Sequence, residues 1–135
     1  MNALIGTNAR RSQQQAVEIL YTTGFALHAQ ERYRDAAQVF QIMLQAAPTD
    51  ERGWMALADC HEKLGQRYIA LELFSAGTIA AEPAPRCMLS RFRILYDLNR
   101  SQEADEAYDA ALELAATTDD EDLTKLIQNE RRVRP

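Results

Sequence analysis

Glycine and proline are scarce in this chain, with 5 and 4 copies among 135 residues, and both residues weaken α-helices. Their scarcity, together with abundant alanine, favours a helical protein of one domain. No apolar run approaches the roughly 18–20 residues that a membrane span needs. Residues 1–15 also lack the apolar core of a secretory signal. We therefore expect neither membrane insertion nor a signal peptide.

Cysteine is limited to Cys60 and Cys87, which lie in different parts of the chain and form no short-spaced pair. Reduced thiols and a cytosolic protein are the expectation from this usage. Positive charge is also short, because the net charge is −5. A negative balance argues against general binding to phosphate backbones, so no nucleic acid is expected as a partner.

Residues for catalysis or metal binding are equally sparse. His61 stands beside Cys60, and neighbouring positions on a helix point to different faces, so the two side chains are not expected to chelate one ion. The sequence contains no phosphate-binding glycine loop and no nucleophile motif. We therefore expect no enzymatic activity, no bound metal and no cofactor.

A 34-residue period runs through the chain from Val17 to Ala116. It relates several sets of three similar residues, namely Ala36, Ala70 and Ala104; Phe40, Phe74 and Tyr108; Leu20, Trp54 and Met88; and Gln30, Leu64 and Leu98. Within each copy the apolar residues recur at helical spacing, in two runs separated by a short polar break. A fixed period of this length predicts stacked two-helix units.

Two helices in 34 residues, with a small residue and then an aromatic four positions later, resemble the tetratricopeptide repeat. The middle copy is the nearest to that pattern, with Trp54, Leu57-Ala58, Leu64-Gly65, Ala70 and Phe74. The predicted fold is an all-α tetratricopeptide-repeat solenoid of three helix pairs plus a C-terminal capping helix. We expect a flexible or short helical lead-in over 1–15, repeats over about 17–50, 51–84 and 85–116, and the capping helix with its basic tail over 117–135. The expected helices cover about 16–29, 34–47, 51–64, 68–81, 86–98, 102–115 and 119–131, the last with a capping box from Thr118 to Glu121.

The first helix of each pair would line a concave groove. In the tetratricopeptide pattern, positions 2, 5, 9 and 12 of that helix face inward. Those positions hold Glu18, Tyr21, Phe25 and His28; Arg52, Met55, Asp59 and Glu62; and Arg86, Leu89, Arg93 and Tyr96. The centre of this surface is apolar and aromatic, and a second apolar stripe on an already buried helix needs a partner. An extended peptide with a few large apolar anchors fits it. Some tetratricopeptide domains instead use a clamp of basic and amide side chains to bind the C-terminal carboxylate of a heat-shock chaperone. Such a ligand is not expected here, because among the matching positions only Arg86 has the required chemistry.

The run Leu20-Tyr21-x-x-Gly24-Phe25 resembles the first helix of class II type III secretion chaperones, the small cytosolic partners of translocator proteins. Further matches are Tyr33-x-x-Ala36 with Val39-Phe40, Leu57-Ala58-x-Cys60, Leu64-Gly65-Gln66, and Phe74-Ser75-x-Gly77 followed by Pro85-Arg86.

The resemblance implies a bacterial cytoplasmic chaperone that binds an extended segment of a hydrophobic translocator and prevents its premature insertion or aggregation. It implies that Tyr21 and Phe25 form anchor pockets. It also leaves a homodimer open, because the family dimerises through its N-terminal helical region. A tetratricopeptide adaptor for another export substrate, such as a needle subunit, or a general assembly scaffold is the alternative.

Overall fold

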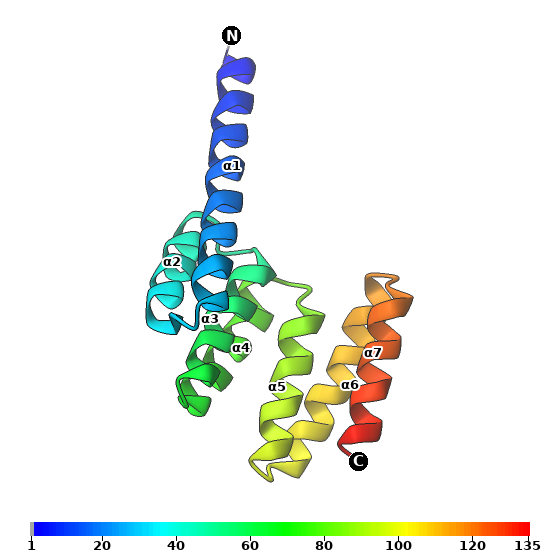
Figure 1. Cartoon of the computed structure of the whole chain (residues 1–135). Coiled ribbons are helices and arrows are strands. Elements are labelled where there is room, and N and C mark those ends of the chain that lie inside the picture. Colours follow the sequence, from blue (N-terminus) through cyan, green and yellow to red (C-terminus); the bar gives the residue numbers. More distant parts are fainter. Residues whose placement is uncertain (1) are drawn as a thin grey trace.

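The computed structural model describes residues 2–135, and in this range the chain forms seven α-helices and no β-strand (Figure 1). The helices are α1 (Asn2–Ala29), α2 (Tyr33–Ala46), α3 (Glu51–Lys63), α4 (Arg67–Ala80), α5 (Pro85–Asp97), α6 (Ser101–Thr117) and α7 (Glu121–Val133). The first six pack as three successive pairs, and α7 packs against α6. The predicted all-α fold of three helix pairs and a final helix is confirmed.

Helix α1 is much longer than the sequence suggested. It runs unbroken for 28 residues from Asn2, so residues 2–15 belong to the same helix as residues 16–29. Met1 lies outside the described residues. Alanine, arginine and glutamine are good helix formers, and a lone Gly6 does not outweigh them. Figure 1 shows the N-terminal part of α1 projecting beyond the helix pairs. Gln13, further along α1, contacts the end of α2, because its Nε2 donates to the carbonyl of Ala46 at 2.9 Å.

The turn inside each pair repeats with the same period as the sequence. Glu31, Gly65 and Asn99, which are 34 residues apart, all adopt positive φ angles of 61°, 77° and 60°. In each turn the next backbone N–H donates to the carbonyl five positions earlier, at 2.8 to 3.0 Å. This arrangement satisfies carbonyls that a helix end leaves without partners. The polar breaks predicted from the sequence are therefore the helix ends.

The buried side chains form two clusters, one around Phe40 and Met43 and one around Phe92 and Leu95. Both clusters contact Trp54, so the core continues from one pair to the next. One equivalent position of the three pairs holds side chains of very different size, namely Gly24, Ala58 and Phe92. A Cβ at Gly24 would lie 2.5 Å from the Phe40 ring, so glycine permits the close approach of α1 and α2.

In the third pair the large ring of Phe92 occupies this position. Phe92 is fully buried, and its centroid lies 5.5 Å from that of Tyr108. The Arg131 guanidinium of α7 lies over both rings, 5.6 Å from Phe92 and 5.1 Å from Tyr108, and it forms an ion pair with Asp105. The final helix is therefore fitted to the larger side chain of the last repeat.

Both cysteines are free and buried. Burial raises the pKa of the Cys60 thiol to about 11 and that of Cys87 to about 12. Separately, no helix within residues 2–135 is both long and apolar enough to cross a bilayer.

Two helix starts depend on carboxylate caps. Asp50 accepts from the backbone N–H of Arg52 at 3.0 Å. The expected capping box from Thr118 to Glu121 is wrong. Asp120 is the cap of α7 and accepts from Leu123 N–H at 3.0 Å, while the Thr118 hydroxyl donates to the carbonyl of Ala115. The helix begins two residues later than expected, which puts Asp120 at the capping position.

Helix α5 has no side-chain cap of its own, because Ala84 precedes Pro85. A carboxylate from the previous repeat takes this role. Glu51 Oε2 accepts from the backbone N–H groups of Arg86 and Cys87 at 3.0 and 3.1 Å. Glu51 thus satisfies two of the donors that a helix start leaves open and ties the second pair to the third.

We expect Glu51→Ala to lower the free energy of unfolding by about 1–2 kcal/mol, because it removes both of these hydrogen bonds. Urea unfolding followed by circular dichroism measures this change. Glu72→Ala, an exposed glutamate on α4, is the matched control and should cost less than about 0.5 kcal/mol. Equal effects of the two substitutions would show that Glu51 does not cap α5.

Candidate functional site

The inner face of the helix stack carries a groove of about 610 Å³. Most of its lining residues come from α1, α3 and α5, and each of these is the first helix of its pair. The lining residues are Tyr21, Phe25, His28, Phe40, Glu51, Arg52, Met55, Ala56, Asp59, Glu62, Phe74, Arg86, Ser90 and Arg93.

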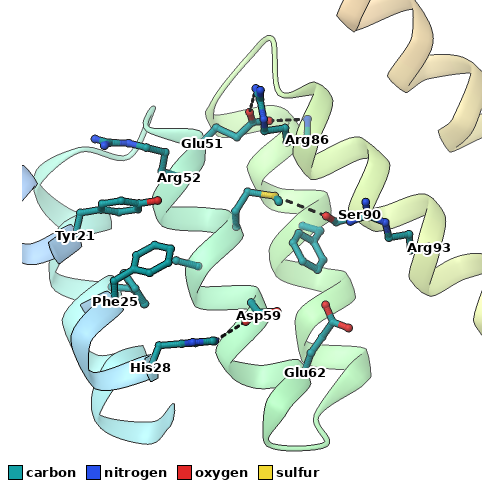
Figure 2. Close-up of a pocket in the computed structure, with 14 residues that line it drawn as sticks. Tyr21, Phe25, His28, Glu51, Arg52, Asp59, Glu62, Arg86, Ser90 and Arg93 are labelled. Atoms are coloured by element: carbon teal, nitrogen blue, oxygen red, sulfur yellow. Dashed lines mark hydrogen bonds and ion pairs between the residues drawn. The ribbon is translucent and has the colours of Figure 1, made fainter. Parts of the chain in front are cut away.

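One wall of the groove is aromatic (Figure 2). The rings of Tyr21 and Phe25 have centroids 4.8 Å apart, one helical turn from each other on α1. The Phe25 ring meets Phe40 edge-on at 6.3 Å, which joins the wall to the core. Phe25 nevertheless keeps 50% of its surface exposed. Because a half-exposed phenylalanine in a concave site still has apolar surface to bury, this wall suits an apolar side chain of a ligand.

The end of the groove near the starts of α3 and α5 carries arginines that are paired with carboxylates. Arg52 Nη2 pairs with Glu18 at 2.7 Å and with Asp50 at 2.8 Å, and its guanidinium lies 4.5 Å from the centroid of Tyr21. The hydrogen bonds from Arg52 lower the pKa of both carboxyls. Arg52 therefore holds the Tyr21 ring against α3 and links the first two repeats.

The opposite end of the groove is acidic. His28 Nε2 and Asp59 Oδ2 are 2.6 Å apart in a hydrogen bond that crosses from α1 to α3. Glu62 follows Asp59 on the same helix and points toward the groove (Figure 2). Burial, and then the nearby Asp59 charge, raise the pKa of Glu62. The aromatic wall thus lies between two charged ends of the groove.

The structure brings most of the predicted site residues together in this groove, and three lie elsewhere. Glu18 is exposed at the rim, where it contacts the site only through Arg52. Leu89 does not face the groove: it is 2% exposed, in a buried cluster with Leu123 and Ile127 of α7. Tyr96 does not line the groove either, and its half-buried ring lies against Phe92. Leu89 and Tyr96 do not line the groove because in the last repeat the Phe92 ring and helix α7 pack against them.

Several residues that line the groove are not among the positions predicted from the sequence. Phe40 and Phe74 stand out in the sequence only as members of the 34-residue period, and nothing in that pattern indicates that they also line the groove. A role for a residue such as Glu51 could have been expected, because Ala84-Pro85 provides no side chain to cap the start of α5. Ser90 is buried and donates to the sulfur of Met55 at 3.7 Å, which helps to fix the Met55 side chain.

Helix α7 is held beside the groove by ion pairs. Arg93, a lining residue, donates to Glu130 at 2.7 Å, and Glu130 also accepts from Arg134 at 2.9 Å. The hydrogen bond from Arg93 is the main cause of the lowered pKa of Glu130. A carboxyl whose pKa is lower in the folded than in the unfolded protein adds stability above its ordinary pKa and loses it as the pH falls.

We therefore expect Glu130→Gln to destabilise the protein by about 1 kcal/mol or less at about pH 7. The difference between the variant and the wild type should shrink as the pH is lowered toward about 4 and below, where Glu130 becomes protonated. Urea unfolding of both proteins across this pH range measures the difference. Gln128→Ala, an exposed position on the same helix, should show no such pH dependence. A difference that stays constant with pH would contradict the ion pair.

Comparison with known proteins identifies curated relatives in two Yersinia species. The low calcium response locus protein H of Yersinia pestis is 29% identical over 100 residues, which cover 74% of this chain and 60% of that protein. The chain thus spans about three fifths of the length of the curated relatives that it matches. No protein-family model matches the sequence.

Solved structures share the fold. The Yersinia enterocolitica type III secretion translocator chaperone SycD superimposes with a TM-score of 0.76 at 24% identity, over 87% of this chain and 88% of that one. PcrH from Pseudomonas aeruginosa gives 0.74 at 25% identity, over 85% and 88%. PcrH bound to the chaperone binding region of PopB gives 0.73 at 25%, over 85% and 94%. The resemblance to translocator chaperones, which the sequence predicts, is confirmed.

Proposed function

We propose that this protein is a cytoplasmic chaperone of a bacterial type III secretion system and that its groove holds an extended segment of a hydrophobic translocator. The chaperone would keep the translocator soluble and competent for export. The observation that carries this proposal is the half-exposed aromatic wall of Tyr21 and Phe25 in a groove that charged side chains also line. A non-enzymatic binding role follows from the same residues.

The relatives support this reading. SycD has been crystallised with a peptide of the translocator YopD, and PcrH with the chaperone binding regions of PopD and PopB. The groove has dimensions that suit such a peptide, because the ten helical steps from Arg52 to Glu62 extend about 15 Å along α3. An extended chain covers that length with about five residues.

The proposed binding residues fall into two groups. The apolar contacts come from Tyr21, Phe25 and Met55, each of which would bury part of a ligand side chain. The charged and polar positions at the groove and its rim are Glu18, His28, Arg52, Asp59, Glu62, Arg86 and Arg93. A few buried apolar anchors would supply most of the affinity, and the charges would set the register.

Coexpression tests the proposal. The translocator encoded with this protein is expected to accumulate in the soluble fraction only when the chaperone is coexpressed, and the two should copurify. Limited proteolysis of the complex, followed by mass spectrometry, should reveal a short protected translocator segment rich in apolar residues. A translocator that remains insoluble, or a complex without a protected segment, would overturn the proposal.

A further inference from the structure

Two charged groups in the groove retain unused hydrogen-bonding capacity. The other charges are engaged: Arg52 with Glu18 and Asp50, Arg93 with Glu130, and Asp59 with His28. Glu51 accepts from the start of α5. Among the described residues, Arg86 and Glu62 are the lining residues whose charged ends form no hydrogen bond within the protein.

Arg86 lies at the first turn of α5 with 54% of its side chain exposed. Its guanidinium is 4.0 Å from Glu51 Oε1 and 3.7 Å from Asp120 Oδ2, and both separations are too long for hydrogen bonds. The Glu51 carboxylate is already held by backbone N–H groups. Arg86 therefore offers its planar set of donors to an incoming carboxylate.

Glu62 lies in the last turn of α3, where the helix dipole favours a positive charge. Its carboxylate accepts no hydrogen bond from the described residues. The cations near enough to influence it, Lys63, Arg67 and Arg93, act only through space. A lysine or arginine of a ligand would therefore meet an anion that is available for direct contact.

The two groups lie at opposite ends of the groove, with the Tyr21–Phe25 wall between those ends (Figure 2). Met55, which lies between Arg52 and Asp59 on α3, lines the groove there as well. Arg86 adjoins Glu51 at the start of α3, and Glu62 lies eleven residues further along that helix, about 16 Å away. An extended peptide spans this distance with about five residues. The complementary charges on one ligand strand would therefore be separated by about that number.

We infer that the translocator segment bound here carries an acidic residue and a basic residue about five positions apart, with apolar residues between them. The acidic residue pairs with Arg86 and the basic residue with Glu62. This inference rests on the proposed function, because it assumes that the groove receives an extended segment. It adds to that function a charge pattern by which the client is recognised.

A displayed peptide library tests the pattern. Random twelve-residue peptides with a fixed central leucine are selected on the immobilised full chain, and the charges of the enriched sequences are counted by position. The wild type is expected to enrich the acid–apolar–base pattern. Glu62→Lys should lose the preference for the basic residue, and Arg86→Glu should lose the preference for the acidic one.

Matched charge changes outside the groove serve as controls. Glu72→Lys on α4 and Arg34→Glu on α2, both exposed positions that do not line the groove, should leave the pattern unchanged. The most enriched peptide, synthesised with its basic residue replaced by glutamine, should bind the wild type about three- to tenfold more weakly. The Glu62→Lys protein should bind the glutamine-substituted peptide at least as tightly as it binds the parent peptide.

The outcomes separate this inference from the proposed function. Enriched peptides that depend on Tyr21 and Phe25 but show no charge pattern would overturn the inference and leave the groove as the binding site. A pattern that persists in Glu62→Lys and Arg86→Glu would also overturn it. Selection that is unaffected by alanine at Tyr21 and Phe25 would overturn the proposed function and the inference together.

Discussion

A protein that carries both Tyr21→Ala and Phe25→Ala is expected to lose translocator binding by a factor of roughly 100 or more. Each large apolar anchor that is fully buried contributes roughly 1.5–3 kcal/mol, and the double substitution removes the wall against which the anchors pack. A loss of about 3 kcal/mol already corresponds to more than a hundredfold change in affinity. The fold should survive, because Phe25 is half-exposed and Tyr21 is only partly buried.

The measurement is calorimetric titration with the translocator segment that the chaperone protects from proteolysis. Circular dichroism monitors the helix content of the variant. Ile19→Ala and Ile42→Ala are matched controls, because both side chains are exposed, by 65% and 52%, and neither lines the groove. These controls should bind as the wild type does. Undiminished binding by the double variant would favour the alternative reading, in which an adaptor docks its partner on another face.

Phe92→Ala is expected to cost about 3–5 kcal/mol of unfolding free energy, the usual range for a phenylalanine truncated in a core. Phe92 is fully buried beside Tyr108, and the Arg131 guanidinium lies over both rings. Alanine is the residue at the equivalent position of the middle repeat, Ala58. It would nevertheless leave a cavity here, because the third pair and α7 are packed around the larger ring.

Urea unfolding measures this cost, and Phe25→Ala provides the matched control. The chemical change is the same, but Phe25 is 50% exposed, so its truncation should cost less than about 1 kcal/mol. A cost below about 1.5 kcal/mol for Phe92→Ala would mean that α7 repacks into the space. The last repeat would then be less closely fitted than its contacts indicate.

The period of the sequence was sufficient to predict the helix pairs, because it fixes features that recur. The three turn residues at positive φ and the aromatic positions of the second helices recur with it. The chaperone resemblance followed from a few residues on α1 and around Pro85. Both rest on short-range patterns, which a single sequence displays directly.

The features that the sequence did not reveal depend on contacts between distant residues. The burial of Leu89 results from the packing of the last pair and α7, although its repeat equivalents Tyr21 and Met55 line the groove. The cap that Glu51 provides for α5 joins residues 35 and 36 positions apart. The length of α1 was missed for another reason, because helix propensity without an apolar stripe is a weak signal.

The deep burial of the two native thiols has a practical consequence for spectroscopy. Thiolate is the species that reacts with maleimide dyes, and at neutral pH almost none is present when the pKa is about 11 or 12. A cysteine introduced at Ile19, which is 65% exposed, would therefore take up the dye selectively without removal of Cys60 or Cys87. Fluorescence anisotropy on an otherwise unaltered chain would then report its assembly with a client in real time.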